Sequence, residues 1–142
     1  MGYHSKLRGE IQFHPPVSGP ELAPHSRFIP TGSSWDEGKR LVWLKMDEEI
    51  VPTYDGIRTR VRAVGIRTSQ GDELRADDLL SEVDEIWKVF RFCPDGTPRT
   101  FNGEIRVFGE ESPDVWRVIM IANEPVEQHP KLVWPDGTEE DV

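Results

Sequence analysis

The sequence predicts an α+β domain in which an antiparallel sheet of about five to seven strands carries one long amphipathic helix on one face. Three observations support this prediction. Residues 57–63 alternate between small or apolar side chains and arginines, which is the two-residue period of a strand. Residues 77–92 repeat apolar side chains at helical spacing instead. The apolar segments after that helix are separated only by short polar turns, which indicates antiparallel neighbours.

The first strand is expected over residues 2–13. Pro15 and Pro16 should end it, because proline has no N–H to give to a neighbouring strand. Residues 17–38 follow as a long connection rich in glycine, proline and serine, with room for one short helical turn at most. A connection of this length is often functional.

A hairpin is expected next. Residues 40–46 and 49–54 are strand candidates, and the Asp55-Gly56 pair is typical of a tight turn into the alternating segment. The apolar phase of that segment shifts around Gly65, and a β-bulge there would explain the shift.

The helix is expected over residues 77–92. Asp77 or Asp78 can cap its N-terminus, where a negative charge also suits the helix dipole. Six apolar side chains fall within an arc of about 120°, which must lie against the sheet. They are Leu79, Leu80, Val83, Ile86, Trp87 and Phe90.

Three antiparallel strands are expected after the helix, at residues 100–108, 115–121 and 125–134. Gly-Glu-Ile occurs in the first of these and also near the start of the sequence. We therefore expect a single α+β domain over residues 1–134. The acidic segment 135–142 is expected to be a frayed C-terminal tail.

Composition limits the possible functions. The protein has 142 residues, which suits one domain, and its single cysteine excludes an internal disulfide. No segment approaches the roughly 20 apolar residues of a membrane span, so a cytoplasmic protein is expected. Seventeen lysines and arginines against 26 acidic residues give a net charge of −9, which disfavours direct nucleic-acid binding. Solubility is the simplest explanation of this charge.

No catalytic or metal-binding motif is present. Four histidines, His4, His14, His25 and His129, have no ligand-like spacing to one another or to Cys93. Glycine-rich phosphate loops and nucleophile motifs are also absent from the sequence. The sequence therefore predicts no catalytic residue, no metal site and no cofactor.

Arg58, Arg60 and Arg62 are the strongest candidates for a binding surface. Three guanidinium groups on one strand face, about 6.6–6.8 Å apart, could bind phosphates or carboxylates. The alternative, which we favour, is pairing with acids on a neighbouring strand. The candidate partners are Glu48, Glu49 and Glu104.

Two further groups are candidate interaction surfaces. Trp35 and Trp43 lie outside the helix, and tryptophan and arginine are enriched at protein–protein hot spots. The outer face of the helix is acidic and could mimic a run of phosphates to occupy a DNA-binding protein. It consists of Asp77, Glu82, Asp84 and Glu85.

Three motifs resemble those of an uncharacterised family of small actinobacterial and actinophage proteins. They are MGYHSKLRGEIQFHPP at residues 1–16, DVWRV at 114–118 and LVWPDGTEE at 132–140. The resemblance covers both ends of the sequence and covers residues 31–99 poorly. It implies a compact cytosolic accessory protein, and it supplies no catalytic residue.

Two functions are weighed on this basis. The first is a non-enzymatic accessory protein of a phage or an actinobacterium that binds a host protein. The second is a small-ligand binder or enzyme with a cleft beside residues 17–38, with His14, His25 or Trp35 near its mouth. A deep pocket with converging polar groups would favour the second function. An exposed apolar or charged face would favour the first. The sequence leaves the partner and the oligomeric state open.

Overall fold

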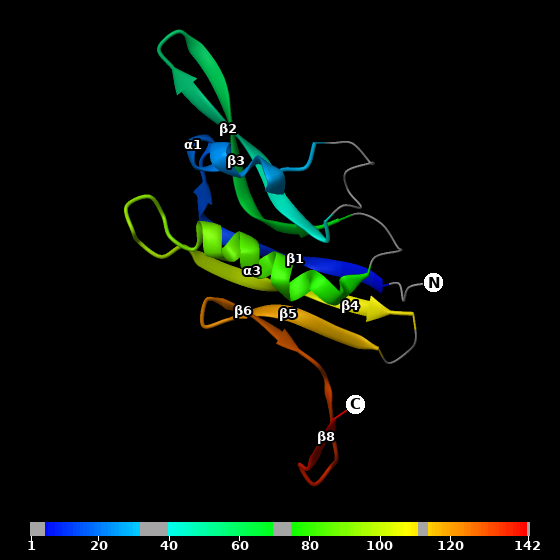
Figure 1. The fold of residues 1–142 in the computed structure, drawn as a ribbon. Helices are drawn as coiled ribbons and strands as arrows, with labels where there is room; N and C mark the ends of the chain where they lie inside the picture. Colours follow the sequence, from blue (N-terminus) through cyan, green and yellow to red (C-terminus); the bar gives the residue numbers. More distant parts are fainter. Residues whose placement is uncertain (1–4, 32–39, 70–74, 111–113, 142) are drawn as a thin grey trace.

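The protein is described here by a computed structural model, which covers residues 5–31, 40–69, 75–110 and 114–141. Within these residues, six strands form one antiparallel sheet and two more form a separate hairpin. Helix α3 (Leu79–Phe90) lies across one face of the large sheet (Figure 1). The predicted α+β fold is confirmed. The strands are β1 (Ser5–Val17), β2 (Val42–Thr53), β3 (Gly56–Thr68), β4 (Thr100–Gly109), β5 (Val115–Ile121), β6 (Glu124–Gln128), β7 (Lys131–Val133) and β8 (Glu139–Asp141).

The strand order across the large sheet is β2-β3-β1-β4-β5-β6. The first strand in the sequence therefore lies in the middle, between β3 and β4, and it is antiparallel to both. β2 and β6 are the edge strands. Every other pair of neighbours is a hairpin between consecutive strands.

Helix α3 uses the predicted apolar face. A 3-10 turn, Ala76–Asp78, precedes it, so the helix proper is shorter than the sequence predicts. Asp78 occupies the N-cap position, but its side chain makes no capping hydrogen bond. Leu80 is half-buried against the core, and the other five members of the predicted arc are buried.

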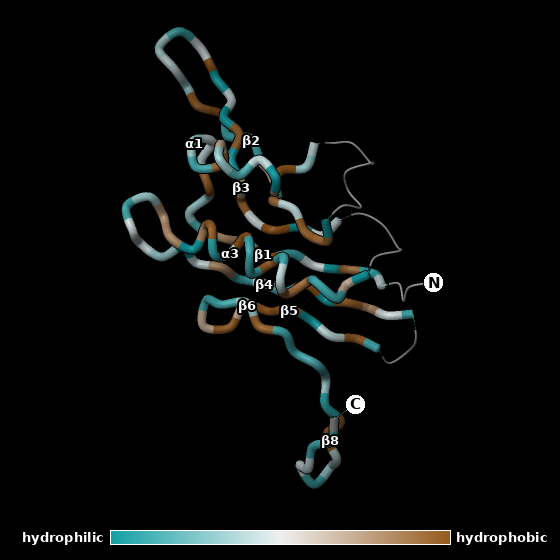
Figure 2. The backbone as a smooth tube through the Cα atoms, in the orientation of Figure 1, coloured by the Kyte–Doolittle hydropathy of each residue, from teal (hydrophilic) through white to brown (hydrophobic). Residues whose placement is uncertain are grey.

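The core lies between α3 and one face of the sheet. Ile11, Ile66, Ile105 and Val118 come from four successive strands of the sheet and are fully buried there. Figure 2 shows hydrophobic residues along α3 and along the strands beside it. Charged side chains alternate with the buried ones along the strands and face away from the helix.

The predicted end of the first strand is wrong. β1 continues through both prolines to Val17, which pairs with Ala63 of β3. Pro15 and Pro16 give no N–H, and their carbonyl oxygens accept hydrogen bonds from the Arg99 side chain instead of a neighbouring strand. A distant side chain thus supplies the donors for these two carbonyl oxygens.

The two Gly-Glu-Ile triplets pair with each other across β1 and β4. Gly9 lies opposite Ile105, and Ile11 lies opposite Gly103. Both glycines have positive φ, +104° and +122°. A Cβ atom on either one would collide with a backbone carbonyl oxygen of the other triplet, so only glycine fits at both positions.

The β2–β3 hairpin contains the predicted bulge. Lys45 lies opposite Gly65, and the next residue, Met46, lies opposite Ala63, so Val64 is the extra residue. A Cβ atom on Gly65 would lie 2.5 Å from the Ile11 carbonyl oxygen, which explains the glycine beside the bulge. β2 is one continuous strand, and its Pro52 is tolerated because β2 is an edge strand.

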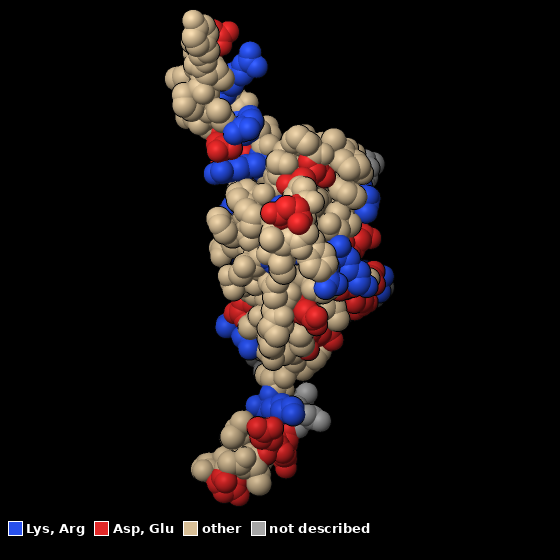
Figure 3. All heavy atoms as spheres, turned by 90° about the vertical axis from the view of Figure 1, so that its left-hand side faces the viewer, with Lys and Arg blue, Asp and Glu red and all other residues tan. Residues whose placement is uncertain are grey.

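Residues 47–62 of this hairpin, which we call the arm, project beyond the rest of the sheet. Figure 1 shows the arm extending past the helices and the other strands, and Figure 3 shows it as a narrow projection from the body. Only β2 and β3 form it, so both of its faces reach solvent along most of its length. The sequence predicts the hairpin but not this projection.

The C-terminal segment is not a frayed tail. Residues 139–141 form β8, which pairs with β7 in a second hairpin, at the end of the molecule opposite the arm (Figure 1). Its turn repeats the one after α3, because both contain Pro-Asp-Gly-Thr. In each copy the threonine hydroxyl and, to a smaller extent, the threonine N–H donate to the aspartate carboxylate, and these hydrogen bonds lower the pKa of Asp95 and Asp136.

Among the residues that the structure describes, no helix combines the length and the apolar character needed to cross a membrane.

Candidate functional site

The register of the arm places the three predicted arginines on one face. Side chains directly opposite each other in an antiparallel pair share a face. This face, which we call the ion-pair face, combines Asp47 with Arg62, Glu49 with Arg60, and Val51 with Arg58.

Two of the three arginines are paired there. Arg62 Nη2 lies 3.2 Å from Asp47 Oδ2, and Arg62 Nη1 lies 3.8 Å from Glu49 Oε1. Arg60 Nη2 lies 3.5 Å from Glu49 Oε2. Among the described residues, no carboxylate pairs with Arg58. The favoured explanation, cross-strand pairing, therefore describes Arg60 and Arg62.

Glu48 and Glu104, two of the three predicted partners, do not contribute to this pairing. Glu48 lies opposite Val61, on the other face of the arm. Glu104 lies on β4, where it accepts hydrogen bonds from Arg106 and Arg117 at 2.7 Å. Partial burial would raise the pKa of Glu104, but these hydrogen bonds outweigh it and lower the pKa below its ordinary value.

The opposite face of the arm, which we call the apolar strip, exposes large hydrophobic side chains. Ile50 is 69% exposed, Ile57 is 74% exposed and Val61 is 52% exposed. Ile57 lies opposite Pro52, so the strip is continuous across both strands. Single exposed hydrophobic residues are ordinary, but a contiguous group on a projecting element is typical of a binding surface.

A hollow of about 310 Å³ lies at the base of the arm. One wall comes from the segment that links β1 to helix α1 (Gly19–Leu22), and the other comes from the arm. Arg62 Nε reaches neither solvent nor any hydrogen-bond partner in the described part of the protein. The lining residues are Pro16, Ser18, Gly19, Pro20, Glu49, Arg60, Val61 and Arg62.

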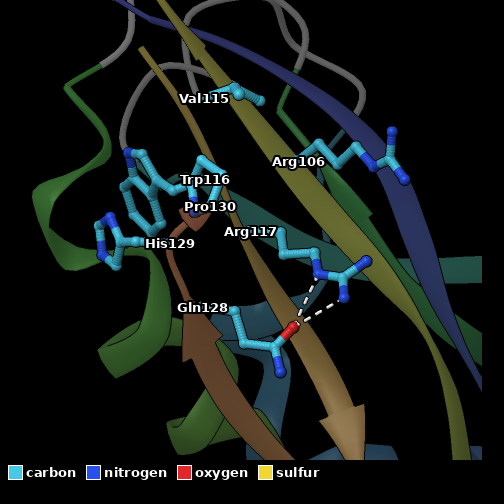
Figure 4. A pocket seen from close by; sticks show the side chains of 7 residues that line it. All are labelled: Arg106, Val115, Trp116, Arg117, Gln128, His129 and Pro130. Atoms are coloured by element: carbon cyan, nitrogen blue, oxygen red, sulfur yellow. Dashed lines mark hydrogen bonds between the residues drawn. The ribbon is translucent and has the colours of Figure 1, made fainter. Parts of the chain in front are cut away.

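A second hollow, of about 290 Å³, lies beside β5 and β6 (Figure 4). Trp116 and His129 stack at 5.5 Å with 16° between their rings, on one side of β5. Arg117 extends to the other side, where Nε and Nη2 donate to Gln128 Oε1 at 2.9 and 2.7 Å. The aromatic pair and the cation are thus separated by the strand, and we interpret this arrangement as support for the sheet edge.

The predicted acidic face of the helix is partly turned inward. Glu82 is half-buried, and its Oε1 accepts a hydrogen bond of 2.9 Å from the Leu41 N–H. Burial raises the pKa of Glu82 despite this bond. Arg40 lies 3.6 Å from Glu82 and 3.3 Å from Glu85, so it partly neutralises both acids.

The other two members of that face differ from each other. Asp84 forms an i,i+4 ion pair with Lys88 at 2.8 Å, whereas Asp77 is exposed in the 3-10 turn. The four acids therefore do not form a uniform row of exposed negative charge, which weakens the hypothesis of DNA mimicry.

The predicted tryptophan surface is not formed as expected. Trp43 is buried, at 5% exposure, and its Nε1–H donates to Ser69 Oγ at 2.9 Å. The expected exposure of Trp43 is therefore wrong. Trp35 lies outside the described residues. His25, predicted near a cleft, stacks on Phe28 and contacts the ring of Phe90 instead.

Arg99, which no sequence pattern indicates, is the most buried charged residue that the structure describes. Its side chain is 1% exposed, and its guanidinium joins three elements. Nε donates to the Pro15 carbonyl at 2.7 Å, Nη1 to the Phe90 carbonyl at 2.8 Å, and Nη2 to Glu21 Oε1 at 3.0 Å. Nothing in the local sequence distinguishes this arginine from an exposed turn residue.

Glu21 is the acidic partner of Arg99, and its position does have a sequence signal. Ser18 and Glu21 have the spacing of a capping box, which marks a helix start. Glu21 Oε2 accepts hydrogen bonds from the Ser18 N–H at 2.8 Å and from Ser18 Oγ–H at 3.0 Å. Burial would raise the pKa of Glu21, but the bonds from Ser18 and Arg99 lower it. Arg99 and Glu21 thereby fix one wall of the hollow at the base of the arm.

The whole sequence, residues 1–142, matches a family of unknown function, DUF6205. The protein belongs to the DUF6205 family. Neither a curated protein nor a solved structure matches it.

The DUF6205 match includes the central region, which the sequence resemblance covers poorly. That region contains both strands of the arm and helix α3. The arm and the hollow at its base therefore lie within the family's own sequence range.

Proposed function

We propose that this DUF6205 protein is a non-enzymatic accessory protein of an actinobacterium or its phage that binds a host protein through the arm. The apolar strip is the observation that carries this proposal. Ile50, Ile57 and Val61 are all more than half exposed on an element that projects from the body. The resemblance to small actinobacterial and actinophage proteins supplies the biological setting.

The strip can contribute a substantial part of the free energy of binding. Fully burying an isoleucine or valine side chain contributes roughly 1.5–3 kcal/mol. Tyr54, at the tip, adds an aromatic ring of the kind enriched at hot spots. A partner groove that covers Ile50, Ile57 and Tyr54 would therefore obtain several kcal/mol from this surface.

The experiment is an affinity pull-down from actinobacterial lysate with mass spectrometry, using the wild type and the double variant Ile50→Asp/Ile57→Asp. Both side chains are solvent-exposed, so the double variant should fold and lose the partner. Val133→Asp is the matched control, because Val133 is 60% exposed on the C-terminal hairpin. Equal recovery of one stoichiometric partner by the wild type and the double variant would refute the proposal.

A small-ligand binder remains the second candidate function. The hollow at the base of the arm favours it, because Pro16, Ser18, Gly19 and Pro20 place that hollow beside the 17–38 segment. Its volume of about 310 Å³ is at the lower end of the range for small-molecule sites. Such a site can also receive one group of a protein partner.

A further inference from the structure

We infer that the hollow at the base of the arm binds a carboxylate group of the partner protein. This inference rests on the proposed function and names the chemistry that the partner brings to the arm. The carboxylate would lie between Arg60 and Arg62, with its aliphatic neighbours against Pro16 and Pro20.

The charge on the ion-pair face favours one additional anion. Among the described residues of this face, three guanidinium groups lie near two carboxylates, those of Asp47 and Glu49. The unmatched charge of the face is that of Arg58, which does not line the hollow; the lining itself combines two guanidinium groups, those of Arg60 and Arg62, with one carboxylate, that of Glu49. A single carboxylate restores the balance.

The existing ion pairs leave donors available. The three contacts measure 3.2, 3.5 and 3.8 Å, whereas charge-assisted N–H···O bonds are usually about 2.7–2.9 Å. Glu49 is shared between Arg60 and Arg62, so it satisfies neither arginine fully. A ligand carboxylate can therefore bind without first breaking a short ion pair.

Arg62 Nε is the specific indicator of a missing acceptor. It is enclosed by protein atoms and has no hydrogen-bond partner among the described residues. A buried donor without an acceptor is unfavourable, and most such groups in proteins are satisfied. Arg62 lines the hollow, so a rotation of its side chain would bring this N–H to an oxygen atom placed there.

The opposite wall of the hollow is held in place before any ligand arrives. Pro16 and Pro20 restrict the backbone, and Arg99 donates to the Pro16 carbonyl at 3.4 Å. Glu21, paired with Arg99, accepts the Ser18 N–H at 2.8 Å. A pre-organised wall reduces the entropy lost on binding.

A carboxylate suits the hollow better than a phosphate does. Glu49 lines the hollow with its own negative charge, which would repel a phosphate dianion more strongly than a monoanion. The apolar surfaces of Pro16 and Pro20 also match the aliphatic carbon atoms next to a peptide carboxylate. The C-terminus of a polypeptide and an acidic side chain both have this chemistry.

The test follows the Arg62 Nε–Hε resonance of the ¹⁵N-labelled full-length protein by NMR. N-acetyl-leucine serves as the probe for a polypeptide C-terminus, and N-acetyl-glutamic α-amide serves for an acidic side chain. We expect at least one of them to shift this resonance saturably, and the one that binds more tightly identifies the source. N-acetyl-leucinamide, which has no carboxylate, and inorganic phosphate should leave it unchanged.

Three variants sharpen the test. Arg62→Gln should weaken binding of the carboxylate probe about tenfold or more, as monitored by the Arg60 Nε–Hε resonance. Glu49→Gln should tighten it, because it removes a carboxylate that competes for both arginines. Arg8→Gln is the matched control, because Arg8 is exposed on β1 away from the hollow. It should leave the affinity unchanged.

The outcomes separate this inference from the proposed function. If neither carboxylate shifts the Arg62 resonance, or if phosphate or the amide shifts it equally, the carboxylate site is refuted, even if partner recovery still depends on Ile50 and Ile57. If a carboxylate binds but the partner ignores the Ile50→Asp/Ile57→Asp change, the site stands and the proposed function fails. A Glu49→Gln variant that binds the probe more weakly would also refute the inference.

Discussion

Arg99 holds together three elements that are distant in sequence, so its removal is the most informative test of the fold. Arg99→Met keeps an unbranched side chain that approximates the aliphatic part of arginine, and it removes the charge and all the hydrogen-bond donors. Glu21 would lose its cationic partner. The Phe90 carbonyl, at the C-terminus of α3, and the carbonyls of Pro15 and Pro16 would each lose a donor.

The expected loss is about 3–5 kcal/mol, the usual cost of removing one partner from a buried ion pair. Glu21 is 18% exposed and keeps its bonds from Ser18, so the lower half of this range is the better expectation. The total free energy of unfolding of a domain is roughly 5–15 kcal/mol. Arg99→Met should therefore remove a large fraction of the stability, with a smaller loss for Arg99→Lys, whose single ammonium cannot reach all of these acceptors.

Urea unfolding followed by circular dichroism measures this loss. Arg106→Met is the matched control, because Arg106 makes an ion pair with Glu104 on the exposed sheet face. Exposed pairs contribute roughly 0–1 kcal/mol. If the Arg99 and Arg106 variants lose equal stability, or if Arg99→Met loses less than about 1 kcal/mol, the role assigned to Arg99 is wrong.

The same cluster predicts a pH dependence. The pKa of Glu21 is lower in the folded protein than in the unfolded state, where a glutamate has a pKa of about 4.3. The stabilisation that ionised Glu21 provides is therefore complete above its pKa in the unfolded state. It is lost as the pH falls through its pKa in the folded protein. Glu21→Gln should remove this part of the acid destabilisation. An unchanged slope of stability against pH in the acid range would contradict this expectation.

Three further predictions concern single side chains. Glu82→Gln should gain stability relative to the wild type as the pH rises from about 4 to neutrality. The reason is that the raised pKa of Glu82 makes its ionised form costly in the folded state. If urea titrations show the same difference in unfolding free energy between variant and wild type at every pH, this prediction is refuted. Asn123→Ala should lower the free energy of unfolding by about 2–3 kcal/mol, because Asn123 combines a φ of 65° with side-chain hydrogen bonds to two backbone groups. Asn102→Ala, on the exposed face, is the control and should lower it little. Gly65→Ala should lower the melting temperature and cost about 1–3 kcal/mol of stability, because the added Cβ would collide with the Ile11 carbonyl oxygen of β1. Gly19→Ala is the control, because a Cβ there would make only an ordinary van der Waals contact.

Periodicity in the sequence correctly predicts which side of a helix or a strand a side chain occupies. Val83, Ile86 and Phe90 of α3 are buried because helical spacing brings them to the side of the helix that faces the sheet. The alternation of Arg58, Arg60 and Arg62 with apolar neighbours likewise predicts the two faces of the arm.

Periodicity does not predict which distant group meets a given face. The sequence predicts an exposed Trp43, but Ser69 accepts its indole N–H and Trp43 is buried. Glu82 lies outside the apolar arc, yet the Leu41 N–H draws it inward. β1 continues past Pro15 because Arg99, 84 residues later, satisfies the free carbonyl. Each of these outcomes depends on a tertiary contact with no local signal.

For the candidate site, the sequence predicts the arginines but not their surroundings. Spacing alone singles out Arg60 and Arg62, and both line the hollow. The wall opposite them depends on the path of residues 16–20, which Arg99 and Glu21 determine. The sequence does not predict the exposure of Ile50 and Ile57 either, because alternation alone does not distinguish a covered face from an uncovered one.

The paired glycine triplets of β1 and β4 have a consequence for strand alignment. A two-residue slip keeps every side chain on its face, so hydrophobic patterning alone cannot prevent it. In the native alignment Gly9 lies against the Glu104 carbonyl oxygen and Gly103 lies against the Glu10 carbonyl oxygen. After a two-residue slip, residues that carry a Cβ would meet the Glu104 and Glu10 carbonyl oxygens in place of the two glycines. The two identical Gly-Glu-Ile triplets, 94 positions apart, thereby favour one alignment of the two central strands.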